Sequence, residues 1–134
     1  MEQRESVLGK PETKRKVSAQ VLVCSGCCCG RVDKNKPSIP LDWLKKNWKE
    51  RKLLKSVQLT ISGCLGPCDI LNAVSILTNE CQLWFGGLVT DEPYQELLAW
   101  AEETRDLGYP APLPELLRPY QFSRFNDISV GVES

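Results

Sequence analysis

The chain has 134 residues, of which 42% are hydrophobic and 25% charged, and its basic and acidic residues balance to a net charge of zero. These values are typical of one globular domain with tails, which buries a core without disulfide staples. The chain has no histidine, which excludes Rieske ligation, histidine-containing zinc sites and Cys–His nucleophilic catalysis. We see no secretory signal and no apolar run of the ~18 residues that span a membrane. We therefore expect a cytoplasmic protein without a membrane partner.

Hydrophobic periodicity predicts one domain over residues 17–108, flanked by two tails. The predicted elements are a strand over 17–23, a helix over 41–54, strands over 57–61, 73–78 and 81–85, and a helix from Thr90 to Gly108. Asn79-Glu80 suits the turn of a hairpin between the last two strands. The order, β-α-β-β-β-α, is the thioredoxin-like arrangement. We expect an α/β fold of that type with a four-stranded mixed sheet.

The segments outside this domain differ in character. Residues 1–16 are polar and mildly basic, and we expect a disordered tail. Residues 109–134 form a C-terminal extension with four early prolines and no clear periodicity. Its apolar residues favour packing against the domain, whereas docking to a partner or to a second subunit is the alternative. These residues are Leu113, Leu116, Leu117, Tyr120, Phe122 and Phe125.

The two predicted helices carry opposite charge. The helix over residues 41–54 is rich in Lys and Arg, whereas the last helix is acidic and has Arg105 as its basic residue. Such segregation can steer a charged partner, but it is also common on solvated faces, and both interpretations stay open.

Six of the seven cysteines lie in two short stretches, Cys24–Gly30 and Gly63–Cys68. Cys27, Cys28 and Cys29 are consecutive and cannot all reach good disulfide geometry, so a framework of paired disulfides is disfavoured. In a reducing compartment such clusters usually bind metal or take part in catalysis. Each stretch follows a predicted strand, and a helix connects the two strands. If these strands are parallel in one sheet, a right-handed crossover brings both stretches to the same edge.

Four thiolates in two pairs supply the terminal ligands that the two irons of a 2Fe–2S cluster need. The candidate ligands, chosen by spacing, are Cys24, Cys29, Cys64 and Cys68. Cys28 is the alternative to Cys29. The same four cysteines also suit a structural zinc site, a cluster carrier or a redox sensor, whereas a dithiol/disulfide oxidoreductase would use Cys24 and Cys27. Cys81 has strand spacing and is expected in the core.

The segments Cys24-x4-Cys29 and Gly63-Cys-Leu-Gly-Pro-Cys68 resemble the ligand loops of the thioredoxin-like 2Fe–2S ferredoxins. This family includes the small iron–sulfur subunit of respiratory complex I. The segment Leu83–Glu92 resembles the family's last strand and the entry to its last helix. The resemblance covers about residues 17–108. The run of three consecutive cysteines departs from the family pattern.

The resemblance implies a one-electron carrier that is not itself an enzyme, although it can be the electron-transfer component of a larger oxidoreductase. It also implies redox partner proteins and a homodimer, and we expect no nucleic acid as a partner. Backbone N–H groups of four glycines are implied as hydrogen-bond donors to the cluster sulfurs, where they set the reduction potential. These glycines are Gly26, Gly30, Gly63 and Gly66.

Overall fold

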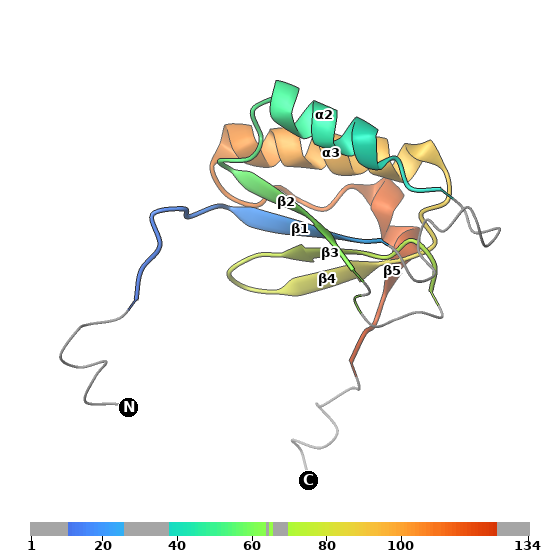
Figure 1. Ribbon diagram of the computed structural model, residues 1–134. Helices are drawn as coiled ribbons and strands as arrows, with labels where there is room; N and C mark the ends of the chain where they lie inside the picture. Colours follow the sequence, from blue (N-terminus) through green and yellow to red (C-terminus); the bar gives the residue numbers. More distant parts are fainter. Residues whose placement is uncertain (1–10, 26–37, 64, 66–69, 126–134) are drawn as a thin grey trace, which may run out of the picture.

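The computed structural model describes residues 11–25, 38–63, 65 and 70–125. In chain order the elements are β1 (Ala19–Cys24), α2 (Leu41–Glu50), β2 (Val57–Ser62), β3 (Val74–Leu77), β4 (Gln82–Phe85), α3 (Asp91–Leu107), the 3-10 helix η2 (Glu115–Tyr120) and β5 (Gln121–Phe122). Helices α2 and α3 lie side by side over one face of the sheet (Figure 1). The prediction of an α/β fold is confirmed. None of the helices in the described part of the chain is long and apolar enough to cross a membrane.

The strands form one mixed sheet in the order β2-β1-β3-β4-β5. β1 and β2 are parallel, and every other neighbouring pair is antiparallel. The predicted parallel pair, connected through α2, is therefore confirmed, and so is the hairpin of β3 and β4. The prediction of four strands is wrong, because β5 adds a fifth strand beside β4.

β5 belongs to the segment that follows α3, and its two residues are too few for a periodic pattern. Its pairing depends on tertiary contacts, since Phe122 lies opposite Trp84 of β4. The preceding helix, η2, buries Leu117 in the core. The expected packing of the C-terminal extension is thus confirmed for Leu117 and for the partly buried Leu113 and Tyr120, but it is wrong for Leu116 and Phe125, which are exposed.

The core lies between the sheet and the two helices. Trp48 of α2 and Tyr94 of α3 are its two largest fully buried side chains. The polar atoms of both rings are hydrogen-bonded: Trp48 Nε1 donates to the carbonyl oxygen of Val57 at 2.8 Å, and Tyr94 Oη donates to that of Leu88 at 2.8 Å. These bonds link α2 to the start of β2, and α3 to the loop that precedes it.

Helix α2 is shorter than predicted and ends at Glu50 instead of Leu54. Lys52 stops it by adopting a left-handed conformation with a φ of 55°. The N–H of Lys52 donates to a carbonyl oxygen three residues earlier at 3.1 Å, and the N–H of Leu53 donates to that of Trp48 at 3.0 Å. These bonds form a Schellman motif, which buries Leu53 and leaves Leu54 exposed. The sequence did not predict this helix end, because a lysine occupies the left-handed position that glycine usually takes.

Cys81 is exposed, so the expectation that it packs in the core is wrong. It lies in the turn between β3 and β4 and precedes Gln82, the first residue of β4. The N–H of Thr78 donates to the carbonyl oxygen of Cys81 at 2.9 Å and closes the turn. Cys81 is therefore exposed because it lies in the turn before β4 begins.

Candidate functional site

The ends of β1 and β2 lie side by side at one edge of the sheet. Cys24, the last residue of β1, is in register with Ser62, the last residue of β2. The N–H of Ser25 donates to the carbonyl oxygen of Ser62 at 2.9 Å, and the N–H of Cys24 donates to that of Ala73 at 3.0 Å. The predicted convergence of the two strand ends is confirmed, so the two cysteine stretches begin from adjacent strands.

Of the four predicted ligands, the structure describes Cys24. The predicted site residues that lie outside the described part of the chain are Cys27, Cys28, Cys29, Cys64, Cys68, Gly26, Gly30 and Gly66. The ligand set, and the choice between Cys28 and Cys29, therefore stay predictions. Among the residues that the structure does describe, no group of three or more Cys, Asp or Glu could hold a metal ion.

Cys24 is buried in a small apolar cluster at this edge. Its exposed fraction is 3%, and it packs with the fully buried Ala73. Ile39, which precedes α2, and Leu65, which belongs to the second cysteine stretch, pack against this pair. Residues from the flank of the first stretch and from within the second stretch therefore meet at Cys24, and its side chain has little contact with water.

Asn72 connects the chain segments that follow the two cysteine stretches. It is fully buried and has a left-handed backbone with a φ of 52°, which Asn tolerates better than most residues. Its Nδ2 donates to the carbonyl oxygen of Leu88 at 3.2 Å and to that of Ser38 at 3.4 Å. The described chain resumes at Ser38 after the first stretch, so one amide joins the two segments. Cysteine spacing does not predict a structural role for Asn72. The sequence feature that could have predicted it is a single amide residue between the apolar Leu71 and Ala73.

The chain that leaves the second cysteine stretch passes close to Gly86, which follows β4. A Cβ atom on Gly86 would overlap Cγ2 of Ile70 and would lie 3.3 Å from Cε1 of Phe122. The N–H of Gly87 donates to the carbonyl oxygen of Leu71 at 2.7 Å. The absence of a side chain at Gly86 therefore permits the segment that begins at Ile70 to lie against the end of β4.

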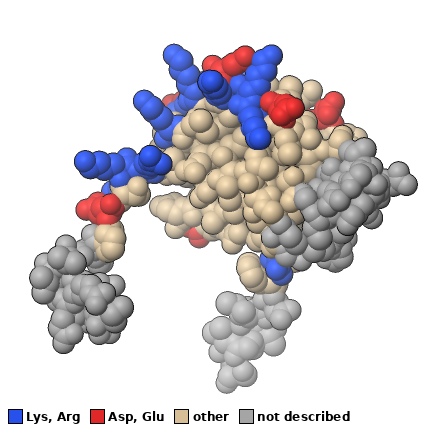
Figure 2. Space-filling model, in the orientation of Figure 1, with Lys and Arg blue, Asp and Glu red and all other residues tan. Residues whose placement is uncertain are grey.

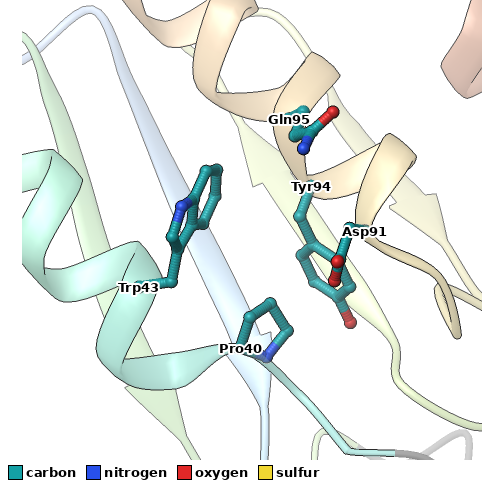
Figure 3. A pocket seen from close by; sticks show the side chains of 5 residues that line it. All are labelled: Pro40, Trp43, Asp91, Tyr94 and Gln95. Atoms are coloured by element: carbon teal, nitrogen blue, oxygen red, sulfur yellow. The ribbon is translucent and has the colours of Figure 1, made fainter.

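Helices α2 and α3 both begin at the edge where β1 and β2 end (Figure 1). Their first backbone N–H groups carry partial positive charge, which favours a negatively charged group nearby. A pocket of about 270 Å³ between the helix starts is lined by Pro40, Trp43, Asp91, Tyr94 and Gln95. Figure 3 shows Trp43 and Tyr94 extending from the two helices around this space. Its charged residue is the acidic Asp91, so the pocket itself does not suit an anion.

Asn72→Asp is expected to destabilise the protein by about 2–4 kcal/mol, because a carboxylate cannot donate to the two carbonyl oxygens and is costly to bury beside them. Urea denaturation at neutral pH measures this loss. Asn79→Asp is the matched control, because Asn79 is exposed in the β3–β4 turn. We expect it to change stability by less than about 0.5 kcal/mol. Equal losses in the two variants would contradict the linking role of Asn72.

This edge of the sheet combines a buried thiol, a second cysteine stretch that starts from the adjacent strand, and the positive ends of two helices. Thiolates in such a place can hold a thiophilic metal. Comparisons with protein-family models, with curated proteins and with solved structures found no match.

Proposed function

We propose that the protein binds one 2Fe–2S cluster and acts as a one-electron carrier. The proposed ligands are Cys24, Cys29, Cys64 and Cys68. The observation that carries the proposal is the register of β1 and β2, in which Cys24 lies opposite Ser62, two residues before Cys64. Leu65, which follows Cys64, packs against the small cluster that contains Cys24. Two pairs of thiolates that start from adjacent strand ends suit the four terminal ligands of two irons.

The strand order supports a thioredoxin-like fold as the finer assignment within the α/β class. The parallel pair β1–β2 is connected by α2, the antiparallel pair β3–β4 follows on the other side of β1, and α3 completes the β-α-β-β-β-α order. β5 and η2 then add to this unit at the edge beside β4. The assignment is independent of the metal and is part of the same proposal.

In this proposal the chain's own residues fix the position of Cys24 and shield its thiol from water. Cys24 lies at the end of β1, which has hydrogen-bonded neighbours on both sides, so its position is fixed. Ile39, Leu65 and Ala73 limit the access of water to this thiol. When bound, the cluster supplies a couple that exchanges one electron at a time.

The burial of Cys24 speaks against dithiol/disulfide exchange as the main function. A nucleophilic thiol must be accessible to its substrate, whereas Cys24 is 3% exposed. A structural zinc site would use the same four cysteines as the proposed cluster, so metal analysis decides between these two. We propose no chemical reaction that the chain catalyses by itself; it serves redox partner proteins, alone or within a larger oxidoreductase.

We also propose a compartment and an oligomeric state for the protein. Adjacent cysteines stay reduced in a reducing compartment, which favours the cytoplasm. The resemblance to the ferredoxin family suggests a homodimer, and neither a nucleic acid nor a membrane is a proposed partner.

Anaerobic purification followed by iron, sulfide and zinc analysis tests the proposed function. We expect a brown protein with about two irons and two sulfides per chain. Reduction with dithionite should produce an EPR signal that the oxidised protein lacks. A colourless protein with one zinc would establish the zinc site instead. A metal-free protein with a reversible disulfide between Cys24 and Cys27 would establish dithiol chemistry.

Repeated reduction and reoxidation then separates an electron carrier from a cluster donor. A carrier returns to its oxidised spectrum with unchanged iron and sulfide content. A donor loses both to an added apo-ferredoxin, and this outcome would replace electron transfer by cluster delivery as the function.

A further inference from the structure

A groove lies along β2, at the end of the sheet opposite Cys24. It has a volume of about 570 Å³ and is formed by the segment before β1, the turn after α2 and the first half of β2. We call it the basic groove. Its charged lining residues are Lys14, Arg15, Lys16 and Lys55, and none of its lining residues is acidic.

The cations of the basic groove have few partners in the described part of the chain. Lys16 forms an exposed pair with Glu12 at 3.3 Å, which contributes little to stability. No described carboxylate pairs with Lys14, Arg15 or Lys55. Figure 2 shows Lys and Arg side chains gathered over α2 and the segment before β1. In a chain with a net charge of zero, cations therefore outnumber the acidic side chains that lie among them over α2 and the segment before β1.

A second hollow, of about 270 Å³, extends the basic groove along the end of α2. It shares Leu54 and Lys55 with the groove and adds Lys49 and Lys52. The short end of α2 creates this surface, because the Schellman motif turns Leu54 outward. Leu54 is 51% exposed, and Val17 on the groove's other side is 37% exposed. Two apolar side chains thus stand among several cations, which suits a ligand with both acidic and apolar groups.

β2 is an edge strand of the sheet, and β1 is its one neighbour among the described strands. Gln58 and Leu59 of β2 line the basic groove. The backbone groups of Val57, Leu59 and Ile61 face away from β1. Those of Val57 bond the carbonyl oxygen of Leu53 and Trp48 Nε1, so the groups of Leu59 and Ile61 form the open part of this edge among the described residues. An open strand edge presents backbone N–H and carbonyl groups that can pair with an added strand. Lys55, which precedes β2, and the cations of the segment before β1 oppose pairing with like-charged strands and favour an acidic one.

We propose that the basic groove binds an acidic, extended segment of a partner protein, which adds to the sheet as a strand beside β2. The cations select acidic side chains, Val17 and Leu54 contact apolar ones, and the outward backbone groups of Leu59 and Ile61 supply hydrogen bonds. This docking goes beyond electron transfer and does not depend on bound metal. The cations of the groove lie roughly 20 Å from Cys24 along β1, whereas the added strand would pair with Leu59 and Ile61 and approach Ser62.

Other occupants fit these observations less well. A single-stranded nucleic acid stacks its bases on exposed aromatic rings, but the aromatic residue that lines the adjoining hollow, Trp48, is 1% exposed. A second copy of the chain would have to offer an acidic strand. In the described part of the chain, acidic residues gather on α3, which is helical.

Fluorescence anisotropy with a short labelled peptide of alternating Val and Glu, at low ionic strength, tests the proposal. Arg15→Glu/Lys55→Glu should weaken binding at least about tenfold. Lys45→Glu/Lys46→Glu is the matched control, because it lowers the net charge equally at exposed positions of α2 that line neither hollow. It should change affinity less than about threefold. A peptide with proline in place of alternate valines cannot pair with a strand edge and should also bind at least about tenfold more weakly.

Equal losses in the two double variants would overturn the proposal in favour of bulk charge, and undiminished binding of the proline peptide would overturn strand addition. Oligo(dT) that binds more tightly than the peptide, and that loses affinity in the groove variant, would assign the groove to nucleic acid. A dimer in sedimentation that the groove variant abolishes would assign it to a second copy. Circular dichroism checks folding, and Arg15→Gln/Lys55→Gln replaces the groove variant if that variant fails to fold. Iron analysis of the same samples reports on the proposed cluster separately.

Discussion

Cys24→Ser is expected to abolish cluster binding and to leave the fold intact. The serine hydroxyl resists ionisation and is a poor ligand for iron compared with a thiolate. The new side chain has nearly the same size, so the packing against Ala73 and the backbone bonds at the end of β1 can persist. Iron and sulfide should fall from about two per chain to near zero, with loss of the visible absorption and an unchanged far-UV circular dichroism spectrum.

Cys81→Ser is the matched control, because Cys81 is exposed in the β3–β4 turn, away from the cysteine edge. It should keep full iron and sulfide content. The pair Cys28→Ser and Cys29→Ser then identifies the second ligand, and we expect loss of the cluster in the Cys29 variant alone. Normal iron and sulfide content in Cys24→Ser would show that Cys24 is not a ligand, and would remove the register of β1 and β2 as support for the proposed function.

Gly86→Ala is expected to destabilise the protein by about 1–3 kcal/mol, because the added methyl group overpacks a tight contact. Its Cβ would overlap Cγ2 of Ile70 and would lie 3.3 Å from Cε1 of Phe122, so the β-branched Ile70 side chain would have to leave its present rotamer. The segment that follows the second cysteine stretch would have to move away from β4. We therefore expect a lower urea midpoint and, in the metal-loaded protein, faster loss of iron to a chelator.

Gly63→Ala is the control for this prediction. Gly63 lies between β2 and Cys64, and a Cβ at Gly63 would have no atom within 4 Å. Alanine there should be neutral or should stabilise by up to about 1 kcal/mol, because it restricts the unfolded chain. Ile70→Ala should restore room in the Gly86 variant, so that the double variant loses less than the sum of the two single losses. Equal urea midpoints for Gly86→Ala and Gly63→Ala would refute the close contact.

Local signals in the sequence predicted the elements whose boundaries depend on neighbouring residues. Gly108 stops α3 with a φ of 82°, and the Asn79-Glu80 turn closes the β3–β4 hairpin, as the pattern indicated. The parallel pairing of β1 and β2 followed from a strand–helix–strand order. The helix end and the turn depend on neighbouring residues, and the parallel pair follows from a general rule for strand–helix–strand units, which is why the sequence was sufficient for them.

Features that depend on tertiary contacts escaped prediction. β5 is stabilised by its pairing with β4 and has no pattern of its own. Lys52 takes a left-handed conformation because Leu53 is buried, not because lysine favours it. At the candidate site, cysteine spacing named the ligands but could not reveal that Cys24 is sheltered by Ala73 or that Asn72 joins the flanking segments.

The strand order predicts that the chain at the end of β2 separates from the sheet more readily than the chain at the end of β1. β1 has a hydrogen-bonded strand on each side, whereas β2 has β1 as its one neighbour among the described strands. Local opening of a sheet starts where backbone pairing is least, so the chain at Ser62 separates from its neighbour at a lower free energy than the chain at Cys24. If the proposed cluster is bound, we expect its loading and release to proceed from the β2 side, with Cys24 as the less mobile of the proposed ligands.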